Sequence, residues 1–62
     1  MKIWYAIMMD TEDTDWGTGS YDKAEALAKA AELRADGYDE AYVAVIEESE
    51  NDAVCVEEIH EI

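Results

Sequence analysis

The segment of residues 23–36 constrains the fold most, because it has the composition and the flanking residues of a single helix. Residues 23–35 are all Ala, Leu, Glu, Lys or Arg, which are the best helix formers. Asp22 can cap the first turn, and Glu25 can complete a capping box. Gly37 supplies the left-handed conformation that closes many helices. We therefore predict one helix in the middle of the chain, with the rest of the domain built from the segments on either side.

The two sides of this helix differ in composition. The charged residues Glu25, Lys29, Glu32 and Asp36 fall along one side. We expect the buried side to consist of Ala24, Leu27, Ala28, Ala31 and Ala35. So many small side chains predict that the helix packs closely on the face of a sheet.

Three apolar segments have the composition of strands. Residues 3–9, 40–47 and 53–59 are rich in β-branched and aromatic side chains. The last two flank a turn-forming stretch at residues 49–52, so we predict a hairpin. A four-residue loop would set Ile46 opposite Cys55 and Val45 opposite Val56, which keeps apolar residues facing one another.

The resulting order predicts one β-α-β-β domain of the α+β class, which spans residues 1–62, with a three-stranded sheet packed on one helix. A right-handed crossover would make the first two strands parallel, either adjacent or with the third strand between them. We favour the third strand in the middle, antiparallel to both others.

One helix covers only one face of such a sheet, so the other face would be exposed. Strand alternation assigns to that face Trp4, Met8, Tyr42, Ile46 and Ile59, with Ala6 and Ala44 forming a shallow hollow. Exposed apolar patches mark interfaces. We predict an interaction surface here, for a homodimer or a protein partner. The alternative is that the loop of residues 10–20 covers this face, with Trp16 in the hollow.

The charge is strongly negative, with 17 Asp and Glu against 4 Lys and Arg, a net charge of −13 and no basic side chain after Arg34. Such a field repels phosphate, which disfavours direct binding of nucleic acid or an anionic membrane and favours basic partners. The single Cys fits a reducing compartment, so we expect a cytoplasmic protein. No segment approaches the roughly 20 apolar residues of a membrane span.

The carboxylates gather in two segments of the sequence. With parallel strands, both segments would lie at one end of the sheet and form an acidic pole made of Asp10, Glu12, Asp13, Asp15, Glu47, Glu48, Glu50 and Asp52. The ligand spacing of a calcium loop is absent from it. Glycines at positions 17 and 19 precede the helix, but they match no complete nucleotide motif and lie beside acids.

No catalytic, metal or cofactor residues emerge from the sequence. Cys55 would need a base beside it, and the only histidine, His60, falls on the opposite face of a regular strand. We therefore predict Cys55 to be a small buried hydrophobic residue, and we expect no enzymatic activity and no cofactor.

The segments at residues 16–20, 41–47 and 55–59 (WGTGS, AYVAVIE and CVEEI) together resemble a set of small acidic bacterial proteins whose activity is uncharacterised. The resemblance implies a bacterial origin and a compact α+β domain, and it carries no catalytic residue over.

These observations predict a non-enzymatic protein-interaction module, in which the apolar face or the acidic pole binds a partner. The alternative is an acidic mimic of nucleic acid that inhibits a basic DNA- or RNA-binding protein. Such a mimic needs carboxylates spaced like phosphates over one face, and its binding weakens steeply with salt. A carboxylate metal site is a third hypothesis, and it needs ligands that converge on one ion.

Overall fold

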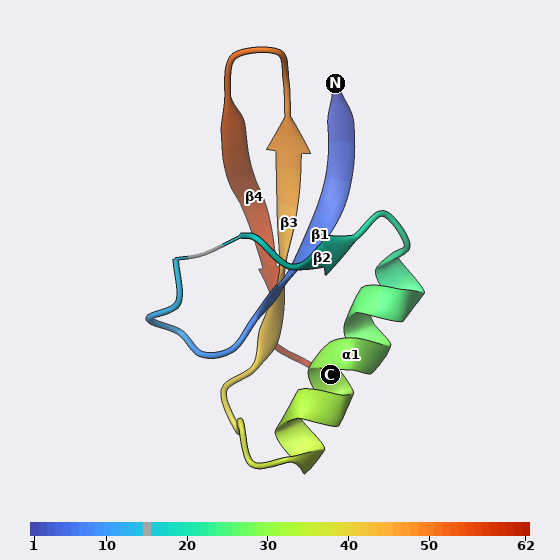
Figure 1. The fold of residues 1–62 in the computed structure, drawn as a ribbon, viewed down its shortest axis with the longest axis vertical. Helices are drawn as coiled ribbons and strands as arrows, with labels where there is room; N and C mark the ends of the chain where they lie inside the picture. Colours follow the sequence, from blue (N-terminus) through green and yellow to red (C-terminus); the bar gives the residue numbers. More distant parts are fainter. Residues whose placement is uncertain (15) are drawn as a thin grey trace.

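The computed structural model describes residues 1–14 and 16–62. Its elements are β1 (Lys2–Met8), β2 (Gly19–Ser20), α1 (Lys23–Ala35), β3 (Tyr42–Glu48) and β4 (Ala53–Ile59). The strands form one antiparallel sheet in the order β2-β1-β3-β4, with α1 against one face (Figure 1). The predicted α+β class, the single helix and the three long strands are confirmed. The short strand β2, which lies in the predicted loop, adds a fourth strand.

The predicted strand arrangement is wrong. β1 lies next to β3 and runs antiparallel to it, with Lys2 opposite Glu48 and Met8 opposite Tyr42, so β4 is at the edge of the sheet and not in its centre. The reason is the return of the chain after β1. Residues 9–18 bring it back so that Ser20 pairs with Tyr5, and α1 then runs in the same direction as β1 (Figure 1). β3 must therefore return in the opposite direction.

The predicted hairpin of β3 and β4 is confirmed, but its register changes halfway. Ile46 lies opposite Cys55, as predicted, whereas Val45 lies opposite Glu57. Val56 is therefore the extra residue of a β-bulge. The bulge reverses the alternation for the rest of β4, and Ile59 consequently lies opposite Val43, on the α1 side of the sheet.

The start of α1 is capped as predicted by Asp22. Its carboxylate accepts hydrogen bonds from the backbone N–H groups of Ala24 (2.9 Å) and Glu25 (3.3 Å). In a capping box, the Glu25 side chain would accept a hydrogen bond from the backbone N–H of Asp22. Here that N–H donates instead to Ser20 Oγ, at 3.0 Å.

The end of α1 is a Schellman motif closed by Gly37, which has a φ of 109°. The N–H of Tyr38 donates to the carbonyl of Leu33 (3.0 Å), and that of Gly37 to the carbonyl of Arg34 (3.2 Å). The Arg34 guanidinium continues the connection, because Nε donates to the carbonyl of Ala41 at 2.7 Å and an Nη donates to the carbonyl of His60. Arg34 thus fixes the end of α1 to the start of β3 and to the residue after β4.

The core has two layers, one on each face of the sheet. On the α1 side, Ala26 and Ala30 are fully buried against Ile7 and Val43. Of the predicted buried side of the helix, Leu27 does pack against this layer. The prediction is wrong for Ala24, Ala28, Ala31 and Ala35, which are exposed. The second layer, on the opposite face, contains four of the residues predicted to form an interaction surface, Met8, Tyr42 and Ile46 with Trp4 packed against them. No helix among the described residues has the length and apolar character that crossing a membrane requires.

Candidate functional site

The face predicted to be an interaction surface is mostly buried within the chain. Met8 and Ile46 are 1% and 0% exposed, and Tyr42 is also buried. Together with Ala6 and Ala44 they form one core cluster, against which the half-buried Trp4 packs. Ile59 lies on the other face because of the bulge. The prediction that these five residues form an exposed surface is therefore wrong.

This face is covered by the chain itself, which was the alternative weighed from the sequence. Trp16, in the segment between β1 and β2, packs against the cluster, and so does Ala53 at the start of β4. In Figure 1 the residues that follow β1 swing out to one side of the sheet, and those that lead into β2 cross in front of it. The cluster that Trp16 packs against includes the small side chains Ala6 and Ala44.

The acidic residues of this covering segment take part in its turn. Asp10 Oδ1 accepts from the N–H of Glu12 at 2.8 Å, and Asp13 Oδ2 accepts from the N–H of Met9 at 3.1 Å. The Asp13 N–H in turn donates to the carbonyl of Asp10 at 3.2 Å. These carboxylates thus stabilise the reversal that brings Trp16 over the sheet.

The predicted acidic pole is divided between the two ends of the sheet. Glu47, Glu48, Glu50 and Asp52 belong to the β3–β4 hairpin, at the end where β1 begins. Asp10, Glu12 and Asp13 follow the other end of β1. Asp15 lies outside the described residues. Because β1 and β3 are antiparallel, the two groups cannot share an end, and the prediction of a single pole is wrong.

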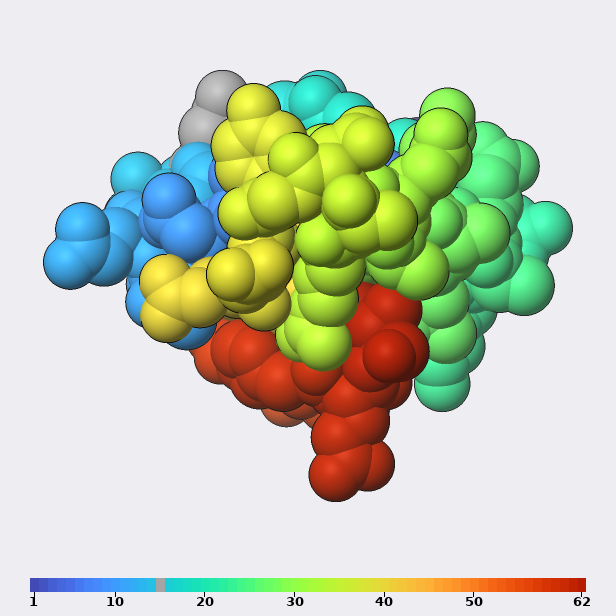
Figure 2. Space-filling view, turned by 90° about the horizontal axis from the view of Figure 1, so that it is seen from below, coloured from blue at the N-terminus to red at the C-terminus, as the bar shows by residue number. Residues whose placement is uncertain are grey.

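At its own end, the loop after β1 meets the connection between α1 and β3. Asp10 lines a surface hollow together with Asp39 and Glu40. Figure 2, which looks onto this end, shows residues around position 10 beside those around position 40. The carboxylates that lie together at this end are therefore those of Asp10, Asp39 and Glu40, and not the set predicted from the sequence.

Tyr42 and His60 form an aromatic pair at the same end. Their ring centroids are 4.4 Å apart with an interplanar angle of 28°, and His60 Nε2 lies 2.9 Å from Glu58 Oε1. Burial of the Tyr42 hydroxyl raises its pKa, and the negative charges of Glu58 and nearby groups raise it further. The raised pKa favours the neutral phenol of Tyr42. This fits a structural role for the ring better than a role as a proton donor.

Cys55 is exposed, and the prediction that it is buried is wrong. Its thiol donates to the carbonyl of Glu57 across the bulge, at 3.4 Å. Cys55 lies opposite Ile46, four positions along β3 from Tyr42, which stacks on His60. At about 3.3 Å per strand residue, roughly 13 Å separates the two positions. The thiol and the imidazole are thus too far apart to act as a nucleophile and its base.

The exposed apolar residues of the sheet lie elsewhere, two on the edge strand β4 and one on β1. Ile3 (49% exposed) and Val54 (45%) flank Glu47 in one row across the sheet, and Val56 (51%) follows at the bulge. The row lies on the α1 side of the sheet. It is near the end where the N-terminus and the β3–β4 hairpin extend beyond the start of α1 (Figure 1). We name Ile3, Val54 and Val56 the β4 edge surface. The sequence analysis did not predict this surface, because it assumed that the helix covers the whole of this face.

Comparison of the chain with protein-family models, curated proteins and solved structures finds no match. Among residues 1–14 and 16–62, no three His, Cys, Asp or Glu side chains are grouped closely enough to hold a metal ion. The functional argument therefore depends on the surface of the chain itself.

Proposed function

We propose that the chain is a non-enzymatic protein-interaction module, and that it binds an extended basic segment of a partner along β4. The observation that carries this proposal is the β4 edge surface. Within the part of the chain that the structure describes, β4 pairs with β3 alone, so half of its backbone groups face away from the sheet. An added strand would pair with these groups, a recurrent mode of peptide recognition.

The apolar part of the surface gives such a segment side-chain contacts. Val54 and Val56 are about half exposed, and Ile3 extends the apolar area across the sheet. Alternate residues of an added strand would contact Val54 and Val56 on one face, whereas Ile3 lies two strands further in, on β1. Burying the exposed part of a valine contributes on the order of 1 kcal/mol.

The charge around β4 selects a basic partner. The hairpin and strand carry Glu47, Glu48, Glu50, Asp52, Glu57 and Glu58. No Lys or Arg follows Arg34; His60 lies 2.9 Å from Glu58, and Lys2 lies opposite Glu48. Lysines or arginines in the added strand would lie close to these carboxylates, which speeds association and excludes acidic segments. A second copy of the chain is less favoured, because each copy carries a charge of −13.

The test is a titration with a synthetic peptide in which Lys and Val alternate, beside a peptide in which Glu replaces Lys. We expect the basic peptide to bind and the acidic one not to bind. Val56→Lys should weaken binding about five- to tenfold relative to Tyr21→Lys, a matched change at another exposed apolar residue. Equal effects of the two substitutions would show that net charge alone attracts the peptide, and would refute the proposal.

The same pair of variants distinguishes strand addition from nucleic-acid mimicry. A mimic depends on carboxylates and not on Val56, so Val56→Lys and Tyr21→Lys would weaken it equally. Self-association is separated by light scattering. A dimer that Val56→Lys dissociates, and Tyr21→Lys does not, would assign the β4 edge surface to a second copy instead of a basic partner.

A further inference from the structure

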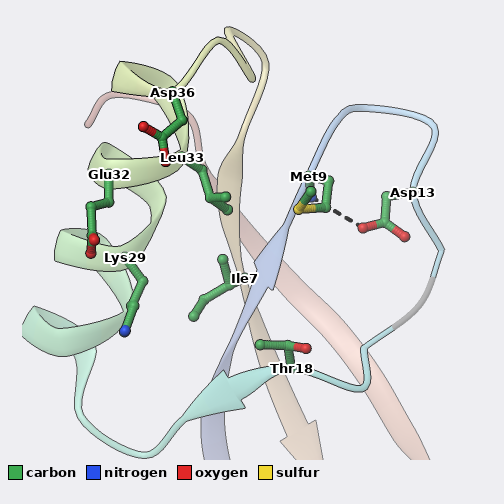
Figure 3. A pocket seen from close by; sticks show the side chains of 8 residues that line it. All are labelled: Ile7, Met9, Asp13, Thr18, Lys29, Glu32, Leu33 and Asp36. Atoms are coloured by element: carbon green, nitrogen blue, oxygen red, sulfur yellow. Dashed lines mark hydrogen bonds between the residues drawn. The ribbon is translucent and has the colours of Figure 1, made fainter.

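A groove runs between α1 and the segment that follows β1, on a different part of the molecule from the β4 edge surface (Figure 3). Its volume is about 500 Å³, within the range of small-molecule sites. We name it the α1 groove; its lining consists of Ile7, Met9, Asp13, Thr18, Lys29, Glu32, Leu33 and Asp36.

The floor of the α1 groove is largely apolar. Ile7 and Met9 come from β1 and the residue just after it, and Leu33 reaches in from the helix (Figure 3). Met9 keeps more than a third of its surface exposed, so the floor is accessible. An extended aliphatic chain would gain contact with all three side chains.

The charged side chains stand on both walls. Glu32 and Asp36 belong to the helix wall and Asp13 to the loop wall, where its hydrogen bond to the Met9 N–H fixes its position (Figure 3). Lys29 is the basic member of the lining, so the formal charge of the groove is −2. The two walls therefore offer negative charge on either side of an apolar strip.

We propose that the α1 groove binds a linear aliphatic diamine. Its methylenes would lie on Ile7, Met9 and Leu33, and its two ammonium groups would meet carboxylates of the walls. An anion would be repelled, and a neutral alkane would leave the carboxylates without a counter-charge. A bare divalent ion would leave the apolar floor unused, and the described carboxylates do not converge as metal ligands do. This site does not depend on the β4 edge surface.

The probe is hexamethylenediamine, titrated into the full chain and followed by the backbone amide NMR signals. We expect the signals of Ile7, Thr18 and Leu33 to shift. Hexylamine, with one ammonium group, should bind more weakly than the diamine, and hexanediol, with none, more weakly again. Equal shifts with hexanediol, or full displacement of the diamine by an equal concentration of Mg²⁺, would overturn the proposal.

Two substitutions locate the site. Glu32→Gln and Asp36→Asn should each weaken binding of the diamine about two- to fivefold, as expected for exposed ion pairs. Glu50→Gln, a matched change in the distant hairpin, should have less effect. If Glu50→Gln weakened binding as much as Glu32→Gln, the diamine would be a diffuse counter-ion and the site would be rejected. Val56→Lys and Tyr21→Lys should affect diamine binding equally, which keeps this result independent of the proposed function.

Discussion

Gly19 lies directly against the indole ring of Trp4. A Cβ at position 19 would be 2.5 Å from Trp4 Cζ3 and 2.6 Å from the backbone oxygen of Tyr5. The backbone oxygen cannot move away without breaking the pairing of β1, so we expect Gly19→Ala to lower the free energy of unfolding by about 1–3 kcal/mol. Urea denaturation measures this. Thr11→Ala, in the exposed loop, should change stability by less than about 0.5 kcal/mol. Equal stability of both variants would contradict the close packing.

Trp16 covers the core cluster that contains Met8 and Ile46. Trp16→Ala should therefore destabilise the chain by about 2 kcal/mol or more, since large aromatic deletions in cores cost about 3–5 kcal/mol and this indole is only partly buried. It should also expose the face and cause self-association, measured by light scattering with Tyr21→Ala as the control. A Trp16→Ala protein that stays monomeric and stable would contradict the covering role of the loop.

The Asp22 carboxylate satisfies two N–H groups at the start of α1. Asp22→Ala should lower the free energy of unfolding by about 1 kcal/mol. Asp22→Ser should lower it much less, because both Asp and Ser are good N-caps. Circular dichroism during urea denaturation gives the comparison. The control is Asp39→Ala, which removes the same charge outside the helix. If Asp39→Ala cost as much as Asp22→Ala, capping would not explain the loss.

The raised pKa of Tyr42 predicts how stability changes at alkaline pH. The folded chain keeps the Tyr42 proton at a pH where the unfolded chain has lost it, because burial disfavours the phenolate. The resulting stability is fully present below about pH 10 and is lost as the pH rises through the folded-state pKa. The free energy of unfolding should therefore fall more steeply above pH 10 in the native chain than in Tyr42→Phe. Equal slopes in the two proteins would contradict the shift.

The position of α1 could be predicted from the sequence because its signals are local. Asp22 and Gly37 act within one turn of the helix that they bound. The side that α1 buries could not be predicted in the same way. Alanines occur on every side of the helix, so the alanine pattern could not separate Ala26 and Ala30 from the exposed alanines. The signal that marks the buried side is the pair Leu27 and Leu33, which pack on the same cluster.

The strand order depended on a segment whose path has no local signal. A direct connection from the first strand into the helix would have made the first two strands parallel. Pairing of Ser20 with Tyr5 instead returns the chain along β1, and a two-residue strand has no periodicity from which to predict it. The wrong prediction of a single acidic pole follows from this, because it assumed that the first two long strands are parallel.

The candidate site was mispredicted for a second reason, the bulge at Val56. Alternation counted from Val54 assigns Ile59 to the wrong face once an extra residue enters β4. The exposed apolar side chains of the sheet are Ile3, Val54 and Val56, and not those of the face that Trp16 covers. The alternative of a covering loop is the more accurate prediction, because Trp16 packs against this face.

Amide hydrogen exchange of β4 is the most direct test of strand addition. The chain is compared with and without the alternating Lys and Val peptide, residue by residue. The account predicts slower exchange at alternate amides within residues 53–59, where N–H groups that face away from β3 gain partners. Protection limited to residues 9–18, or binding with no change in β4, would contradict it.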